Sequence, residues 1–259
     1  IIAAAKNLGI DIKFSHVVIA ANGYKKVNSA QIAQISPDKK DLGKIEKINC
    51  DCICVSGFWT PSIHLSSQSG NKTKFDDKID AFVPGKSKQN ETTVGSANGI
   101  FNLEETINTS FEKGYELSKK ITNKDNKVSI PQVSEKNYTS HDKFWCVPLP
   151  DKKHYKRFLD FQNDVTVSDI ELALREGYRS IEHVKRYTTL GMATDQGKTS
   201  NLNGLQLVSD VENKIVPSVG HTTFRPPYTP VSIGAIVGRE VGKHSKPTRK
   251  SPMHSWHEK

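Results

Sequence analysis

Hydrophobic and polar positions alternate along the first part of the chain and then change to helical spacing. Residues 10–23 and 25–36 are two strand candidates that end in turn residues. Residues 47–57, "KINCDCICVSG", form a short apolar run before a glycine, which is typical of a strand in a covered parallel sheet. Residues 92–121 begin as extended chain and continue as a helix. This part of the chain is therefore expected to be α/β.

Helical spacing dominates the region that follows residue 155. The apolar residues that recur at this spacing are Ile170, Leu172, Leu174, Ile181 and Val184. We expect Ser168 or Asp169 to cap the first of these helices and Gly177 to end it.

Shifts in composition divide the chain into four parts. Residues 1–121 form the α/β part, and residues 122–150 are a polar, lysine-rich linker with three prolines. Residues 151–205 are a small, mainly helical module, and residues 206–259 are irregular. The N-terminus is expected to be a helix that enters a strand and not a signal peptide, because a basic n-region is missing.

Composition narrows the possible functions. The 259 residues are 35% hydrophobic and 25% charged, with a formal net charge of +9. The lysines are scattered, which favours a solvated surface over nucleic-acid binding, although a basic interaction protein stays an alternative. No apolar run reaches the roughly 18–20 residues that span a membrane. The cysteine usage does not resemble a secreted disulfide framework, so we expect a cytoplasmic protein.

Cys50, Cys52 and Cys54 alternate, so a strand would place them on one face. On a straight strand their sulfur atoms would lie roughly 7 Å apart per step, too far for one tetrahedral metal ion. We therefore favour a buried core strand over a metal site, because free cysteine is often buried.

The stretch "GMATDQGKTSN", residues 191–201, nearly spells a phosphate-binding P-loop. Five residues separate its two glycines where the motif has four, and a helical pattern precedes it where the motif needs a strand. The sequence therefore argues against a P-loop. A second glycine-rich stretch, "VGSANGIFNLEET", lies just before a helix, whose N-terminus suits a phosphate. An ordinary tightly packed turn is the alternative there.

Long strings of this chain resemble the alpha subunit of heterotetrameric sarcosine oxidase. Residues 50–85 match the end of its dinucleotide-binding region, with an S-G-x-W-T-P turn and an H-L-x-S-Q segment. Residues 160–204 resemble its next domain, and residues 222–240 and 251–259 resemble the entry to its aminomethyltransferase-like, folate-binding domain. The resemblance implies a Rossmann-like flavoprotein region with two dinucleotide-binding domains, and it implies that the chain is a middle segment of such a subunit.

The module is also similar to the small [2Fe–2S] module of related amine and proline dehydrogenase subunits. That module carries Cys-x-Cys-Glu-x-Val-Thr and Cys-Gln-Gly-Arg-x-Cys, and its four cysteine positions fall here on Asp160, Gln162, Asp195 and Ser200. Iron–sulfur clusters need thiolates, with histidine as an occasional substitute, so no cluster is expected. The resemblance then implies that 195–200 is a refitted cluster loop. It either faces a flavin through Lys198, Thr199 and Ser200 or serves packing alone.

The resemblance implies oxidation of the N-methyl group of sarcosine, with tetrahydrofolate as one-carbon acceptor and oxygen reduced to hydrogen peroxide. FAD is expected in the beta subunit, FMN between alpha and beta, NAD in alpha, and tetrahydrofolate in the downstream domain. The expected partners are the beta, gamma and delta subunits, with neither nucleic acid nor membrane. An opine, proline or dimethylglycine dehydrogenase is the alternative. No residue of this segment is expected to attack substrate.

Site residues follow from the same resemblance. The family's nucleotide pattern places Ser96, Ala97, Phe101 and Leu103 near the dinucleotide. Ser96 stands where FAD-type folds usually carry Asp. Whether the bound dinucleotide is NAD or FAD therefore stays open. Arg225, between prolines, could pair with a phosphate or with a carboxylate at a domain junction. The histidines show no metal spacing, so no metal site is expected.

Overall fold

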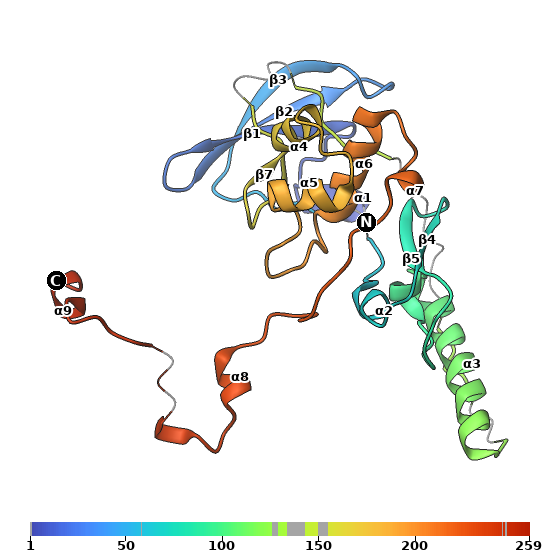
Figure 1. Ribbon diagram of the computed structural model, residues 1–259. Helices are drawn as coiled ribbons and strands as arrows, with labels where there is room; N and C mark the ends of the chain where they lie inside the picture. Colours follow the sequence, from blue (N-terminus) through green and yellow to red (C-terminus); the bar gives the residue numbers. More distant parts are fainter. Residues whose placement is uncertain are drawn as a thin grey trace.

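The structure is a computed structural model (Figure 1). It describes residues 2–57, 59–125, 129–133, 143–149, 155–244, 246 and 248–259.

The N-terminal region is a three-stranded antiparallel sheet preceded by the short helix α1 (Ile2–Asn7). Its strands follow in the order β1 (His16–Gly23), β2 (Val27–Ile35) and β3 (Leu42–Asn49). The two predicted strands and the N-terminal helix are thus confirmed. The strands pair as an antiparallel meander and not as a parallel sheet, since the short connections leave no room for a crossover of a dozen or more residues. Among the described residues, every strand pair is antiparallel.

The prediction of a buried cysteine strand was wrong. Strand β3 ends at Asn49, and the residues that follow have no regular structure. Cys52 and Cys54 are exposed, and their Sγ atoms lie 3.8 Å apart, closer than the spacing expected on a strand. The reason is that β3 is the edge strand of the sheet and is almost entirely exposed, so among the described residues no further strand covers the cysteines that follow it.

A second unit connects the sheet to the long helix. The helix α2 (His64–Gln68) is followed by the hairpin β4 (Thr73–Asp76) and β5 (Ala81–Pro84). A 3₁₀ turn η1 (Gly95–Asn98) then leads into α3 (Leu103–Thr122), as predicted from the sequence. Asn102 caps α3 by accepting a hydrogen bond from the backbone N–H of Glu105 at 2.9 Å. Figure 1 shows α3 projecting from the rest of the chain, and none of its residues is buried.

The helical module begins with a small hairpin, β6 (Phe158–Asp160) and β7 (Val165–Thr166). Helices α4 (Val167–Arg175), α5 (Ile181–Thr188), α6 (Asn201–Glu212) and α7 (Val216–Val219) follow. The residue that caps α4 is Thr166 and not Ser168, and Asp169 is its partner in a capping box. Gly177 adopts φ +96° just after α4 ends, as the sequence predicted.

One hydrophobic core holds the module together and reaches outside it. Helix α6 runs past the expected boundary at 205, and Val208, Val216 and Phe224 extend the same core. Ile63 and Phe82, which come from the segments around α2 and β5, pack into this core as well. The loops of the module are therefore fixed against the preceding part of the chain, because both share one buried cluster.

Beyond the core the chain continues as a long tail with the short elements α8 (Ile233–Val237), η2 (Gly242–His244) and α9 (His254–His257). None of these elements contains a buried residue, and Figure 1 shows the tail running away from the folded part. Within the described parts of the chain, no helix combines the length and the apolar character needed to cross a bilayer.

Candidate functional site

The loop 191–200 lies between α5 and α6. Its two glycines leave room for the side chain of Asn201, which packs against both. Gly191 and Gly197 adopt φ values of +67° and +74°, a region that side chains disfavour. A Cβ atom on either glycine would lie 2.2 Å from Oδ1 of Asn201. The Asn201 amide fills the space over both glycines and donates to Oγ1 of Thr222 at 3.2 Å.

Carboxylates of the protein occupy the backbone donors that a P-loop would offer to phosphate. Asp195 accepts hydrogen bonds from the N–H groups of Gly197 at 2.9 Å and Thr199 at 3.3 Å. It also accepts from Oγ1 of Thr199 at 2.7 Å. A phosphate would have to displace this carboxylate, so the geometry supports the expectation that the loop is not a P-loop.

Asp160 ties the other end of the loop to the hairpin β6–β7. Its side chain is 2% exposed, and its Oδ2 accepts from the N–H of Gly191 at 2.8 Å and from Oγ of Ser200 at 3.4 Å. Its Oδ1 accepts from the N–H groups of Gln162 and Asn163 at 2.9 and 3.4 Å. The carboxylate therefore joins the hairpin, the loop and the start of α6.

Gln162 adds a second connection between the hairpin and the loop. Its Oε1 accepts from Oγ1 of Thr194 at 2.9 Å and from the N–H of Asp195 at 3.3 Å. The Gln162–Asp195 and Asp160–Ser200 contacts join two pairs, and the hydrogen bond from the N–H of Gln162 to Asp160 connects these pairs. All four positions that the resemblance assigns to cluster cysteines are therefore linked. The residues present do not fit a [2Fe–2S] cluster, because the set contains two carboxylates, an amide and a hydroxyl and no thiolate.

The three residues predicted to face a flavin are placed differently from one another. Lys198 is partly buried, with its Nζ 2.6 Å from the backbone oxygen of Tyr228 and 4.0 Å from the centre of that ring. Thr199 is exposed, but its N–H and hydroxyl groups are bound to Asp195. Ser200 is completely buried and donates to Asp160, so its hydroxyl does not face an outside ligand. Lys198 is the strongest candidate of the three.

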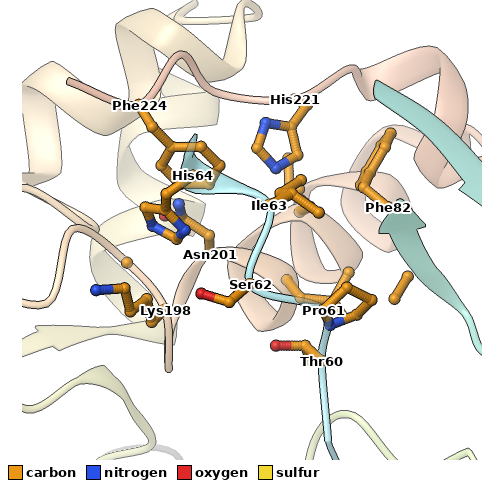
Figure 2. Close-up of a pocket in the computed structure, with 14 residues that line it drawn as sticks. Thr60, Pro61, Ser62, Ile63, His64, Phe82, Lys198, Asn201, His221 and Phe224 are labelled. Carbon is orange, nitrogen blue, oxygen red and sulfur yellow. The ribbon is translucent and has the colours of Figure 1, made fainter. Parts of the chain in front are cut away.

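A pocket of about 100 Å³ opens beside Lys198. Figure 2 shows Phe224, His64 and Lys198 on one side of this pocket and Phe82 on the other. Thr60 and Ser62 contribute hydroxyl groups from the segment before α2 (Figure 2). The volume lies below the roughly 300 Å³ at which small-molecule sites begin, so in this chain alone the pocket holds a few atoms at most.

His64 lines this pocket and was not predicted as a site residue from the sequence. Its ring stacks on Phe224 with 3.6 Å between centroids, and its Nε2 lies 3.0 Å from the backbone oxygen of Gln196. Because a carbonyl oxygen only accepts, Nε2 carries the proton in this contact. Burial lowers the pKa of His64, so the neutral ring is favoured, and its Nδ1 is buried without a partner among the described residues.

His221 lines the same pocket. Burial lowers its pKa to about 4, from an ordinary value of 6.5. The hydrogen bond to the backbone oxygen of Thr222 raises this pKa and only partly offsets the effect of burial, while the charge of Lys185 lowers it further. His221 is therefore neutral at physiological pH.

The predicted dinucleotide residues gather in one short stretch, from η1 to the first turn of α3. Ser96 and Leu103 are exposed, and Ala97 and Phe101 are partly buried. Gly99 adopts φ +82°, and a Cβ there would lie 2.7 Å from Cδ1 of Ile79, so close packing also accounts for this glycine. Because Asn102 already accepts the N–H of Glu105, a diphosphate would rely on the backbone around Ser96 and Ala97.

Metal binding finds no support in the described part of the chain, where no group of three or more His, Cys, Asp or Glu residues converges. Arg225 is exposed, and its charge helps to lower the pKa of the buried Lys185, for which burial is the main cause.

Comparison with solved structures first supports the fold. The crystal structure of L-proline dehydrogenase from P. horikoshii has a similar fold, with a TM-score of 0.52 and 20% sequence identity. The similarity covers 91% of this chain and 47% of that one. The expected mixed α/β chain thus has a counterpart within a dehydrogenase.

Sequence comparison gives a more specific resemblance. Residues 154–239 match the sarcosine oxidase A3 domain. Sarcosine oxidase subunit alpha of Rhizobium meliloti (strain 1021) is 38% identical over 84% of this chain. The same subunit of Corynebacterium sp. is 32% identical over 98% of the chain in strain P-1 and 34% identical over 88% in strain U-96. The predicted resemblance to the sarcosine oxidase alpha subunit is confirmed.

The chain corresponds to only a part of these relatives. It covers 22%, 27% and 24% of their respective lengths.

Proposed function

We propose that this chain is a segment of the alpha subunit of a sarcosine oxidase complex. The observation that carries the proposal is its identity of 32–38% to three sarcosine oxidase alpha subunits over 84–98% of its length. The complex would oxidise sarcosine to glycine, pass the one-carbon unit to tetrahydrofolate and reduce oxygen to hydrogen peroxide. This chemistry is an oxidoreductase reaction on a CH–NH group in the cytoplasm.

Within that complex this segment would bind the dinucleotide and contact the flavin. It would carry no residue that reacts with sarcosine. The stretch around Ser96 and Ala97 would form one wall of an NAD site, because its small side chains leave the backbone accessible. This NAD would not carry electrons. Tetrahydrofolate would bind in the domain that the tail introduces, and FAD would lie in the beta subunit.

The loop 191–200 would face the FMN between the alpha and beta subunits. Lys198 supports this placement, because it is a partly buried cation whose ammonium is held by the backbone and ring of Tyr228. A positive charge of this kind would stabilise an anionic phosphate or ring, more so where a partner subunit excludes water. Gamma and delta subunits would complete the assembly. A loop that serves only packing is the alternative.

A related dehydrogenase for proline, an opine or dimethylglycine is the second candidate. It is favoured by the fold shared with L-proline dehydrogenase, at a TM-score of 0.52. The third alternative, a non-catalytic basic interaction protein, has less support. The sequence similarity to the alpha subunits extends over most of the chain.

Oxygen uptake tests the proposal. The full-length subunit that contains this segment is co-expressed with its neighbouring subunits and supplied with sarcosine, L-proline or dimethylglycine. We expect sarcosine alone to support rapid oxygen uptake with peroxide formation, and added tetrahydrofolate to decrease the release of formaldehyde. Reduction of an artificial electron-acceptor dye with L-proline but not with sarcosine, without oxygen uptake, would favour the second candidate.

A further inference from the structure

Cys52 and Cys54 form an exposed pair of thiols that the proposed function does not use. Their Sγ atoms lie 3.8 Å apart, and both side chains are exposed. On a straight strand the same atoms would lie roughly 7 Å apart, so a bend in the irregular segment after β3 brings them together. We call Cys52 and Cys54 the dithiol.

The dithiol follows the point at which the chain leaves the sheet. The N–H of Cys50 donates to the backbone oxygen of Asn28 at 3.2 Å, which ties the end of β3 to β2. The described residues 51–57 that follow belong to neither a helix nor a strand. Because the sulfur atoms of a disulfide lie about 2.0 Å apart, one sulfur of the dithiol has to move closer by about 1.8 Å. A segment outside the sheet permits a shift of this size.

The two thiols of this pair also influence each other's protonation. Cys54 raises the pKa of Cys52, first through the hydrogen bond that the two sulfur atoms share and then through the repulsion between two thiolates. The pair therefore loses its protons one after the other, and a form with one thiolate beside one thiol precedes the fully ionised form. This form contains both groups that disulfide formation needs, a nucleophilic thiolate and a second thiol that resolves the oxidised product.

We propose that the dithiol is a site of reversible oxidation, at which hydrogen peroxide closes a disulfide between Cys52 and Cys54. The thiolate of one cysteine attacks a peroxide oxygen, the O–O bond breaks, and hydroxide leaves a sulfenic acid behind. The sulfur of the other cysteine attacks the sulfenic sulfur, the S–O bond breaks, and water leaves with the proton of that thiol. In total the two thiols give up two electrons and two protons, and one hydrogen peroxide becomes two water molecules.

The other cysteines of the chain differ from the dithiol. Cys146 is partly buried, and burial raises the pKa of its thiol, which the nearby charge of Arg157 offsets only in part. Cys50 is partly buried as well and lies before the bend. Oxidation of a cysteine follows its exposure and its thiolate character, so we expect Cys50 and Cys146 to stay thiols while the dithiol reacts. Exposed disulfides are also the readily reduced ones, so the reaction should be reversible.

Peptide mapping after peroxide treatment tests the proposal. The full-length subunit that contains this chain is treated with hydrogen peroxide, its remaining thiols are blocked with N-ethylmaleimide, and its tryptic peptides are analysed by mass spectrometry. Trypsin releases residues 48–72, which include Cys50 and the dithiol. We expect this peptide to carry one blocking group and to be lighter by two hydrogen atoms, and dithiothreitol to restore all three thiols.

A second digestion identifies the partners in the disulfide. Cleavage before Asp51 separates Cys50 from the dithiol, so a disulfide between Cys52 and Cys54 stays within one fragment. A disulfide to Cys50 would instead hold two fragments together.

Two serine variants form a matched pair. In Cys54→Ser the resolving thiol is missing, so we expect Cys52 to gain oxygen atoms that dithiothreitol does not fully remove. In Cys50→Ser we expect the disulfide to form at the natural rate. In the natural subunit we expect the dithiol to be oxidised at least about tenfold faster than Cys146.

Three results would overturn the proposal: a disulfide that includes Cys50, equal oxidation rates of Cys146 and the dithiol, or a dithiol that gains oxygen atoms without closing a disulfide. Peroxide is added in this experiment, so its result does not depend on whether the complex oxidises sarcosine.

Discussion

Removing the Asp160 carboxylate is the sharpest perturbation of the module. In Asp160→Ala, the N–H of Gly191 and the hydroxyl of Ser200 lose their acceptor inside the protein. The N–H groups of Gln162 and Asn163 also lose theirs, but these two residues are exposed and water replaces the carboxylate. The cost therefore comes mainly from two donors on buried residues.

The expected magnitude follows from these two donors. A buried donor without a partner costs about 1–3 kcal/mol, so we expect a loss of about 3 kcal/mol in the free energy of unfolding. For a chain of this size this corresponds to a decrease of roughly 6–12 °C in Tm. Asp160→Asn keeps one acceptor oxygen and is expected to lose less.

Thermal unfolding and amide hydrogen exchange measure this effect. We expect the N–H of Gly191 to exchange much faster in Asp160→Ala, because its acceptor is gone. The control is Asp210→Ala, which removes an exposed carboxylate that accepts from Nε2 of Gln206 at 2.7 Å. Such a surface contact contributes about 0.5 kcal/mol or less. Equal Tm decreases in the two alanine variants, or unchanged exchange at Gly191, would refute the cross-linking role of Asp160.

Four further predictions follow from the structure. Gly197→Ala places a methyl group within 2.2 Å of the Asn201 side chain and should lower Tm by more than 5 °C, roughly 2 kcal/mol, as a thermal melt would show. In the folded protein the pKa of His221 is lowered from 6.5 to about 4, so the unfolded chain takes up a proton first as the pH falls. The contribution of His221 to stability is therefore fully present above pH 6.5 and is lost as the pH falls toward about 4. The free energy of unfolding from urea titrations should decrease by about 1.4 kcal/mol for each pH unit lost in this window, and His221→Gln should flatten this slope. Ala97→Glu in the full-length complex should expel the bound dinucleotide by bulk and like charge, and wild-type dinucleotide content would contradict the placement. Lys198→Ala in the complex should loosen beta-subunit association or slow flavin reduction and leave dinucleotide content unchanged; wild-type assembly and kinetics would leave only the packing role.

The sequence predicted the elements whose periodicity is strong and local. The alternating strands before residue 36 and the helix that begins at Leu103 are present as expected. The cysteine run shows where such reasoning stops. A short apolar run does not reveal whether a neighbouring strand exists, and here the adjacent strand β3 is an exposed edge.

The site was predictable only in part. The resemblance to cluster modules assigned Asp160 and Ser200 to one set of positions, but no local pattern predicts the contact that the structure shows between residues 40 positions apart. His64 was missed for the same reason. A single histidine gives no local signal for a pocket, and its partner Gln196 lies 132 residues away in sequence.

We propose that this chain is a segment of a sarcosine-oxidising flavoprotein complex whose alpha subunit works without an iron–sulfur cluster. Anaerobic addition of sarcosine to the purified complex, followed by visible spectroscopy, tests it most directly. The account predicts bleaching of the flavin absorption by sarcosine, with no iron–sulfur bands before or after reduction. Flavin that stays oxidised with sarcosine, or an iron–sulfur spectrum that arises from the alpha subunit, would contradict it.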